Sequence, residues 1–439
     1  MELKRTLGFF DATAIGIGAI IGAGIFVVLG PAIGYAGPAV IVSMIVAGIV
    51  ALFSALSFAE LSSAIPKEGG TYEFAYEMIH PSVGFISGSL WLMAQTVAGT
   101  TISLGLAGYL APYVPILSLQ EIAVSAALIL TVLNIVGLRY SAIVNNTLVL
   151  IKIAILCLFL VVGISQVNSQ NYAQFAPHGF FGILQGAGII FFAYLGFGRI
   201  AALGEEVKNP KRTLPLSILF ALTICALLYV LTGFVATGLL SYTRLAKSLS
   251  PMADAARATG NSALTAAVSF GAVVATVSVL LTNLLGLSRV SFAIARNGQF
   301  PKSLAKVHSK FGTPYLSILM TGTVMTVLTL VLNLPESAAI TSFSMLTTHL
   351  FLHSSAIRLR KKIPNLKTFK APLYPLIPCL GLASCIILMF SLPLISWVVT
   401  LAAILVSLLY YLLNKGISTQ TGKSGGTRDS LDSMGKKSE

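Results

Sequence analysis

The stretch Gly16-Ile-Gly-Ala-Ile-Ile-Gly-Ala-Gly-Ile-Phe26 lies inside a strongly apolar segment, roughly residues 10–31, that is long enough to cross a bilayer. Its four glycines, at positions 16, 18, 22 and 24, weaken the helix in its middle, because each costs about 1 kcal/mol of helix propensity relative to alanine. Hydrocarbon offers no hydrogen-bond partner to backbone freed from a helix, so such backbone persists only where it lines a cavity or meets a ligand. The stretch therefore predicts a broken membrane helix and a site for a polar ligand.

Composition extends this prediction to the whole chain. Of 439 residues, 56% are hydrophobic and 10% are charged, whereas about 25% are charged in soluble domains. We predict an all-α integral membrane protein with about twelve transmembrane helices. The expected spans are residues 10–31, 39–61, 83–112, 121–138, 142–165, 181–203, 213–240, 263–290, 314–333, 338–357, 373–392 and 395–414. Because the first span is too long for a signal-peptide core, we expect no cleavable signal peptide.

The net charge of +14 indicates topology rather than nucleic-acid binding. Under the twelve-span prediction, most Lys and Arg residues fall on the termini and the even-numbered connections, which places both termini in the cytoplasm. We expect a multi-pass protein of the cell membrane whose basic face also attracts anionic lipid. The cytoplasmic ends would be residues 1–9 and 415–439, and the second of these, rich in Ser, Gly, Thr and Lys, is expected to be disordered.

A second pair of glycines, Gly196 and Gly198, interrupts the sixth span. Interrupted spans five apart are typical of two inverted five-helix repeats with a ligand site at their interface. The repeats would cover residues 10–165 and 181–357, followed by two further helices in residues 373–414. Close helix packing at small residues is the alternative explanation for each glycine cluster.

Short motifs along the chain carry a family resemblance. They are Gly22 to Phe26, Pro66 to Tyr72, Phe192 to Phe197, Glu205 to Pro215, Arg296 to Pro301, His308, and Gly312 to Pro314. In this order and at these spacings, they make the chain, from Leu7 to about the tenth span, similar to the amino acid-polyamine-organocation (APC) transporters, in particular to permeases related to the cationic amino acid transporters. The resemblance implies the LeuT-like inverted-repeat fold, with broken helices 1 and 6, and transport by alternating access.

The first break has a specific chemical use. Unpaired N–H groups at the start of a half-helix carry partial positive charge and suit a carboxylate. The resemblance implies that Ile20, Ala23 and Gly24, with Ile25 beside them, receive the α-carboxylate of an amino acid. Ala23 offers only its backbone there, since it has no hydroxyl.

The second break would bind the other end of the same ligand. Carbonyls freed near Phe191, Ala193 and Leu195 could accept hydrogen bonds from the α-ammonium. Phe192 matches the aromatic gate that the family places over its substrate. The alternative for Phe192 is an aromatic side chain that packs in the core or against lipid.

Lys152 lies about ten residues into the fifth span, about 15 Å deep and near the middle of the bilayer. A charged lysine there costs about 2.5–3.5 kcal/mol on insertion scales. Desolvation favours the neutral amine, so this group could exchange a proton near neutral pH. The resemblance implies proton coupling, with contacts to Gly16, Ala19 and Ser278, because proton-coupled members place a lysine where sodium-coupled relatives bind sodium. The alternative is a permanently charged structural lysine bonded to backbone carbonyls.

The chain departs from the family after the second break. Many relatives carry an acidic residue at the position of Gly198, and its loss puts any coupling role there in doubt. Arg199 follows, and two placements are open: a pair with Glu205 or Glu206, or a position facing the inner vestibule.

Charged residues beyond the sixth span could close the inner mouth. Glu205, Glu206 and Lys211 could form an ion-pair latch that, with Phe192, gates the site. The alternative is ordinary positive-inside charge next to a helix stop. His349 and His353 lie four apart on one helical face and could form a proton relay or a metal pair, but helix-packing hydrogen bonds are favoured because no third ligand is evident.

These observations favour a secondary transporter that takes up an amino acid with a proton. We expect a neutral amino acid, since no acidic side chain is confidently placed in the pocket. The alternatives are an amino acid or amine exchanger and, from another class, a membrane sensor that binds without transport. We expect no enzyme activity, cofactor, metal or nucleic-acid partner, and a monomer or weak homo-oligomer.

Overall fold

The structure, a computed structural model, describes residues 7–65, 69–137, 142–201, 207–296, 298–308, 310–364 and 368–418. These residues form α-helices joined by short 3₁₀ and π segments (η), and their one extended pairing is a bridge between Leu7 and Val207. The all-α prediction is confirmed for them. The first elements are α1 (Phe9–Ile20), η1 (Gly24–Val28), α2 (Leu29–Ala36), η2 (Gly37–Ala39), α3 (Val40–Ala64), α4 (Thr71–Met78), α5 (Pro81–Leu110), η3 (Ala111–Tyr113), α6 (Leu119–Val136), α7 (Ala142–Ile164) and η4 (Ser169–Tyr172). The others are α8 (Gly179–Ile190), η5 (Phe191–Phe197), α9 (Gly198–Ala201), α10 (Pro210–Leu239), α11 (Tyr242–Leu245), α12 (Pro251–Ala258), α13 (Ser262–Arg296), η6 (Lys302–Ala305), α14 (Tyr315–Val331), α15 (Leu334–Lys362), α16 (Leu376–Ser391) and α17 (Leu394–Ser418).

Eight helical stretches of the described chain are long and apolar enough to cross a membrane. One of them, Phe9–Ala64, covers the first two predicted spans, while α14 and α16 are apolar but shorter. α15 is long but rich in Ser, Thr and His, and it is not among the eight. These helices indicate a multi-pass membrane protein, whereas the count of twelve and the two inverted repeats stay predictions.

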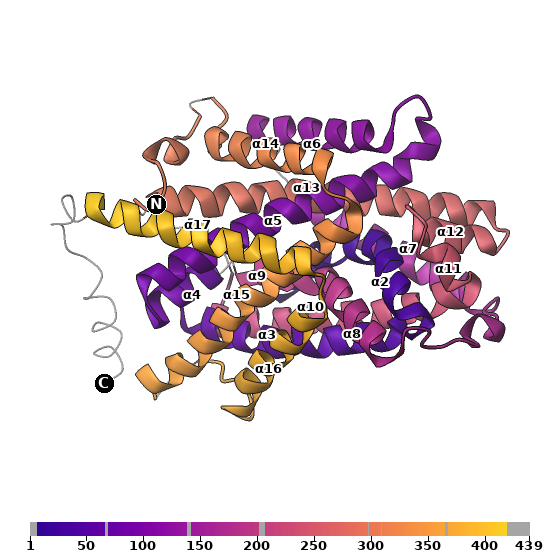
Figure 1. Cartoon of the computed structure of the whole chain (residues 1–439), viewed down its shortest axis with the longest axis horizontal. Helices are drawn as coiled ribbons and strands as arrows, with labels where there is room; N and C mark the ends of the chain where they lie inside the picture. Colours follow the sequence, from indigo (N-terminus) through magenta and orange to yellow (C-terminus); the bar gives the residue numbers. More distant parts are fainter. Residues whose placement is uncertain are drawn as a thin grey trace.

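The long helices α5 and α13 run lengthwise through the molecule and pack against each other (Figure 1). α6 and α14 lie side by side along one edge, and α3 packs against α8 and α10. α1 contacts α7, α10 and η5. The first broken helix therefore lies within the bundle, where other helices surround it.

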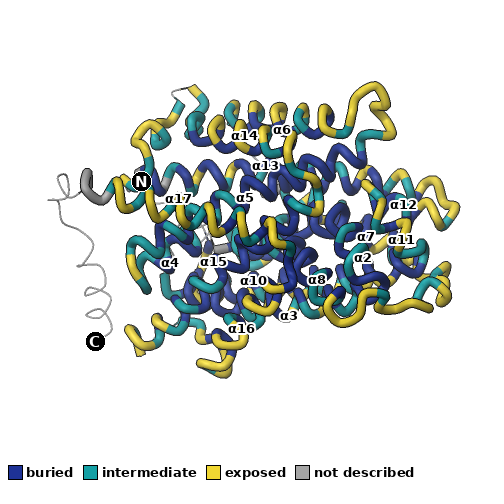
Figure 2. Tube along the Cα trace, viewed as in Figure 1, coloured by how far each residue is buried: buried dark blue, intermediate teal, exposed yellow. Residues whose placement is uncertain are grey.

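The outside of the bundle is apolar and its interior holds many polar groups. Figure 2 shows buried residues through the middle and exposed residues along the outer edges, and the exposed positions include Leu405 and Leu409 of α17 and Val327 of α14. Inside, α15 buries the hydroxyls of Ser344 and Thr347, which donate to carbonyls one turn earlier. This distribution suits a hydrocarbon surrounding, in which buried hydroxyls bond within and between helices.

The first helix breaks directly after α1. Ile21 has an extended backbone (φ −73°, ψ 99°), and the chain bends through Gly22 and Ala23 before η1 continues into α2. The helical bonding of α1 thus stops among the glycines that the sequence marks as weak.

The sixth predicted span is also irregular. α8 ends at Ile190, the seven residues of η5 wind as a 3₁₀-helix, and α9 has four residues. A 3₁₀ stretch of this length is uncommon because its hydrogen bonds are poorly aligned, and inside a longer helix it often marks a functional hinge. Gly196 lies within this segment.

Candidate functional site

The two interrupted helices cross at their glycines. An added Cβ atom at Gly24 would overlap the backbone of Ala193, and one at Gly196 would overlap the backbone of Ala19. Only glycine fits at either position, so close packing is one role of these residues. The same contact brings the irregular backbone of both helices to one place.

Two amides in the first break are free. Of the described residues, none accepts a hydrogen bond from the N–H of Gly22 or Ala23, and both groups precede the helix formed by η1 and α2. Such N–H groups bear the positive end of the helix dipole and can bind an anion. A cavity of about 40 Å³ opens beside them, and its wall includes Ile20, Ala23, Gly24, Phe192, Ala193 and Leu195.

The other residues expected at this site lie behind it. Ile25 and Phe191 are fully buried, and neither lines the 40 Å³ cavity. Phe191 packs edge-to-face on His349, with ring centroids 5.7 Å apart. Phe192 is 9% exposed and lines the cavity, which is the position that a gate requires.

Tyr229 of α10 joins the two breaks and was not identified from the sequence. Its hydroxyl lies 2.7 Å from the carbonyl oxygen of Ile20 and 3.4 Å from that of Ala193, and its side chain is fully buried. The hydroxyl thus contacts the end of α1 and η5 together. A tyrosine inside an apolar run was the available signal, because a buried phenol normally finds a hydrogen-bond acceptor.

Lys152 of α7 is 1% exposed and holds the end of α1. Its ammonium group donates to the carbonyl oxygens of Gly18 and Ile21, each at 3.1 Å. The carbonyls at a helix C-terminus carry the negative end of the helix dipole, so a cation is stabilised there. Both the coupling hypothesis and the structural alternative expect such carbonyl bonds.

A second cavity, of about 50 Å³, surrounds Lys152. Ala19 and Ser278 line it, as the family resemblance implies. Gly16 does not line it and packs against Ile200 and Ala221 of neighbouring elements. The structure therefore brings three of the four expected coupling residues together.

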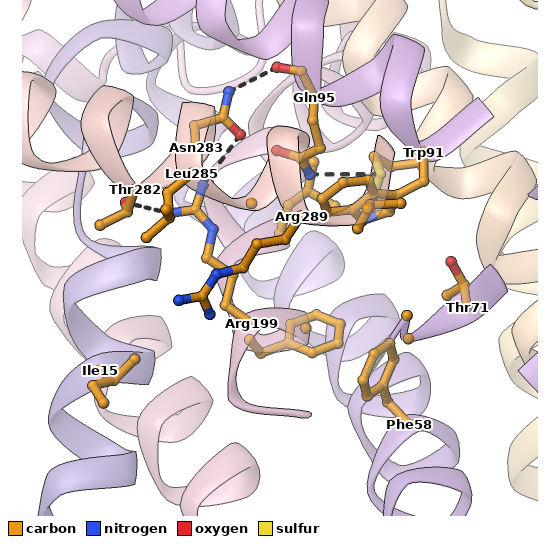
Figure 3. Close-up of a pocket in the computed structure, with 18 of the residues that line it drawn as sticks. Ile15, Phe58, Thr71, Trp91, Gln95, Arg199, Thr282, Asn283, Leu285 and Arg289 are labelled. Carbon is orange, nitrogen blue, oxygen red and sulfur yellow. Dashed lines mark hydrogen bonds between the residues drawn. The ribbon is translucent and has the colours of Figure 1, made fainter. Parts of the chain in front are cut away.

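A third and larger cavity, of about 220 Å³, lies between α5, η5 and α13 (Figure 3). Arg199 lines it and donates to the hydroxyl of Thr282 at 2.6 Å and to the side-chain oxygen of Asn283 at 3.4 Å. Asn283 in turn donates to the carbonyl oxygen of Gln95 at 2.7 Å. Arg199 thus lines all three cavities. A pair with Glu205 or Glu206 lies outside the described residues, and the position facing the inner vestibule stays a prediction.

Only part of the expected inner gate lies within the described residues. Glu205 and Glu206 lie outside the described residues. Lys211 is exposed near the start of α10, and within the described chain it makes no ion pair. A backbone link is present nearby, because the N–H of Lys208 donates to the carbonyl oxygen of Leu7 at 2.9 Å.

The two histidines of α15 have different surroundings. His353 bonds to Ser57 at 2.9 Å and to Ser54 at 3.3 Å, both on α3, which is the helix-packing role favoured from the sequence. His349 instead lines the 220 Å³ cavity, and its Nδ1 atom has no hydrogen-bond partner among the described residues. A shared relay or metal site is not supported by this geometry.

Comparison with known proteins identifies the family to which this chain belongs. The family model for amino acid permeases matches residues 11–421. The chain is 34% identical to the branched-chain amino acid permease BcaP of Bacillus subtilis over 433 residues, covering 94% of this chain and 93% of that protein.

Two further relatives are named for different substrates. The methylthioribose transporter of Bacillus subtilis is 34% identical over 432 residues, covering 94% of each chain. Cationic amino acid transporter 4 of Mus musculus is 31% identical over 404 residues, covering 87% of this chain and 62% of that protein. The chain belongs to the amino acid permease family of the APC superfamily, whose members are transporters and not enzymes.

Proposed function

We propose that this protein is a secondary transporter of the cell membrane that takes up an amino acid together with a proton. The single observation that carries the proposal is the contact between the first helix break and Lys152, whose ammonium group bonds to Gly18 and Ile21 at the end of the first half-helix. Loss of the proton would remove the charge that stabilises these carbonyls. The first half-helix would then be free to change its position, which is the step that alternating access requires.

The backbone of the breaks supports an amino acid as substrate. The free amides of Gly22 and Ala23 suit an α-carboxylate. The carbonyl oxygens of η5 accept bonds within the 3₁₀-helix, and their second lone pairs can accept from an α-ammonium. One relative is named a methylthioribose transporter, so the fold alone does not define the cargo. A site with donors on one segment and acceptors on the other favours a zwitterion.

The coupling role assigned to Lys152 depends on the charges around it. The other cation of its cavity is Arg199, and the nearest further titratable group is the thiol of Cys225 on α10. Within the described residues, no carboxylate lines this cavity. The carbonyl oxygens of Gly18 and Ile21 accept from the ammonium group, so a proton lost from Lys152 weakens the contact that holds the end of α1.

The described cavity walls also bear on the side chain of the substrate. They include no carboxylate that could pair with a cationic side chain. Phe192, Ile102 and Val279 add apolar surface to the 40 Å³ cavity. The walls thus argue against a cationic amino acid, while the neutral amino acid expected from the sequence stays a prediction. The inner gate of Glu205, Glu206 and Lys211, the two inverted repeats and cytoplasmic termini complete the proposal.

Uptake of labelled amino acids into proteoliposomes tests it. Wild-type protein should accumulate substrate when the outside is acidic, and Lys152→Ala should lose the response to the pH gradient. Leu148→Ala, on the same helix and the same cavity wall, is the matched control and should keep that response. Accumulation that needs internal amino acid but no gradient would favour an exchanger. Binding without uptake under every gradient and counter-substrate would favour a sensor.

A further inference from the structure

The 220 Å³ cavity has an unbalanced charge. Arg199 and Arg289 both line it, and of its described lining residues none is Asp or Glu. Figure 3 shows the side chain of Arg199 directed toward Thr282 and Asn283, while that of Arg289 extends into the cavity. A guanidinium is permanently charged, and cations within membrane segments normally pair with an anion or with carbonyl groups.

The present partners of Arg199 leave its charge uncompensated. Thr282 and Asn283 are neutral acceptors, and they engage two of the five N–H donors of the guanidinium. A carboxylate can bind such a fork through two parallel hydrogen bonds, which gives both strength and directional selectivity. Arg199 thus has the capacity to bind an acidic group that the described chain does not supply.

His349 adds a second unused group to the same wall. It is 2% exposed, lines the 220 Å³ cavity, and its Nδ1 atom has no partner among the described residues. A buried polar atom without a partner costs free energy that a ligand can recover. Within the described chain, the wall of the cavity therefore includes a guanidinium with unused donors and a buried imidazole with an unpartnered nitrogen.

The position of Arg199 connects this wall to the amino acid site. Arg199 also lines the 40 Å³ cavity, together with Ala23, Gly24 and Phe192. A ligand whose α-groups occupy the two breaks would have Arg199 on the wall beyond them. The group that reaches Arg199 from there is the side chain of the ligand.

We propose that Arg199 makes the site select an amino acid with a side-chain carboxylate, so that acidic amino acids bind better than their neutral amides. The proposal rests on the proposed function, because it assumes that the breaks hold the α-groups of an amino acid. It replaces the neutral amino acid expected from the sequence with an acidic one.

Binding to the purified full-length protein, measured as ligand-induced thermal stabilisation and by titration calorimetry, tests the selection. L-glutamate and L-aspartate should bind at least about tenfold more tightly than L-glutamine and L-asparagine, a difference that one charge-assisted hydrogen bond can supply. Glutarate, which has both carboxylates but no amino group, should bind at least about tenfold more weakly than glutamate. Equal binding of glutamate and glutamine by wild-type protein would overturn the proposal without any variant.

Single substitutions test whether Arg199 causes the preference for glutamate over glutamine. Arg199→Gln should lose the preference for glutamate and keep the binding of glutamine, and Arg199→Lys should keep part of the preference because it retains the charge but not the fork. Arg289→Gln is the matched control from the same cavity and should keep the preference. Its loss in Arg289→Gln, or its persistence in Arg199→Gln, would contradict the assignment, as would glutarate binding equal to that of glutamate.

Failure of this inference can be told from failure of the proposed function. If glutamine is bound and taken up but glutamate is not preferred, the selection by Arg199 is wrong and the transport function stands. If glutamate binds with the expected preference but no amino acid enters proteoliposomes under any gradient, the selection stands and the transport function is wrong.

Discussion

Replacement of Tyr229 by phenylalanine tests whether the two broken helices act as one site. The substitution removes one oxygen atom and keeps the buried ring. It deletes the hydrogen bond to the carbonyl oxygen of Ile20, at 2.7 Å, and the weaker contact to Ala193, at 3.4 Å. No other hydrogen bond reaches the Ile20 carbonyl from the described residues outside α1.

The magnitude follows from that geometry. A buried carbonyl that loses its partner costs about 1–3 kcal/mol, and the longer contact to Ala193 adds less. Ile20 lies two residues before Gly22, and Ile20, Gly22 and Ala23 all line the 40 Å³ cavity, so part of this cost should appear in ligand binding. If about 1.4 kcal/mol appears there, the Kd for substrate rises about tenfold.

Tyr194→Phe is the matched control. Tyr194 is also fully buried, packs edge-to-face on Tyr229 with ring centroids 5.4 Å apart, and donates to the carbonyl oxygen of Met44 on α3 at 2.9 Å. Tyr194 belongs to η5, but its hydroxyl bonds away from the break to α3, and Tyr194 does not line the 40 Å³ cavity. Loss of this hydroxyl should therefore lower stability without changing the Kd. The assay is thermal unfolding of purified protein across a substrate titration. An unchanged Kd in Tyr229→Phe, or equal changes in the two variants, would refute the reasoning.

Three further substitutions address other contacts. Gly24→Ala should abolish uptake, because its Cβ atom would overlap the backbone of η5; a transport assay with near-normal rates would count against the close crossing. Glu60→Gln should destabilise the protein by about 3–5 kcal/mol, seen as a lower unfolding temperature, because Glu60 is 1% exposed and pairs with Arg360 through bonds of 2.5 and 3.1 Å. Phe192→Ala should raise the KM for uptake more than the equally large truncation Phe191→Ala, which should instead mainly lower stability; the reverse order of KM values would exclude the gate role.

The sequence predicted the elements whose signals are local. Glycines weaken a helix wherever it packs, so the break after Ile20 could be placed from the chain alone. The position of Lys152 inside an apolar run indicates a buried lysine, and its side chain is 1% exposed, whereas its depth in a bilayer stays a prediction. Its hydrogen-bond partners, Gly18 and Ile21, lie two residues beyond the expected Gly16 and Ala19, because helix rotation depends on packing between α1 and α7.

Residues that act across helices were harder to predict. Tyr229 stands in an apolar run of α10, and its contact with two breaks depends on how α10 crosses α1 and η5. The sequence marks Arg199 as a charged residue next to the second break, but its place in three cavities depends on α13 and α5. The sequence could not separate His349 from His353, because both lie on one face of α15 and only the neighbouring helices distinguish them.

Proton movement during uptake tests the central claim most directly. Proteoliposomes loaded with a pH-sensitive dye, held without a pH gradient, are given an inward gradient of substrate, and the internal pH is recorded with the uptake of label. We predict that the lumen acidifies as substrate enters wild-type protein, and that Lys152→Ala gives no acidification even where exchange of label persists. Substrate entry through wild-type protein without acidification, or acidification that survives in Lys152→Ala, would contradict the role assigned to Lys152 at the end of the first half-helix.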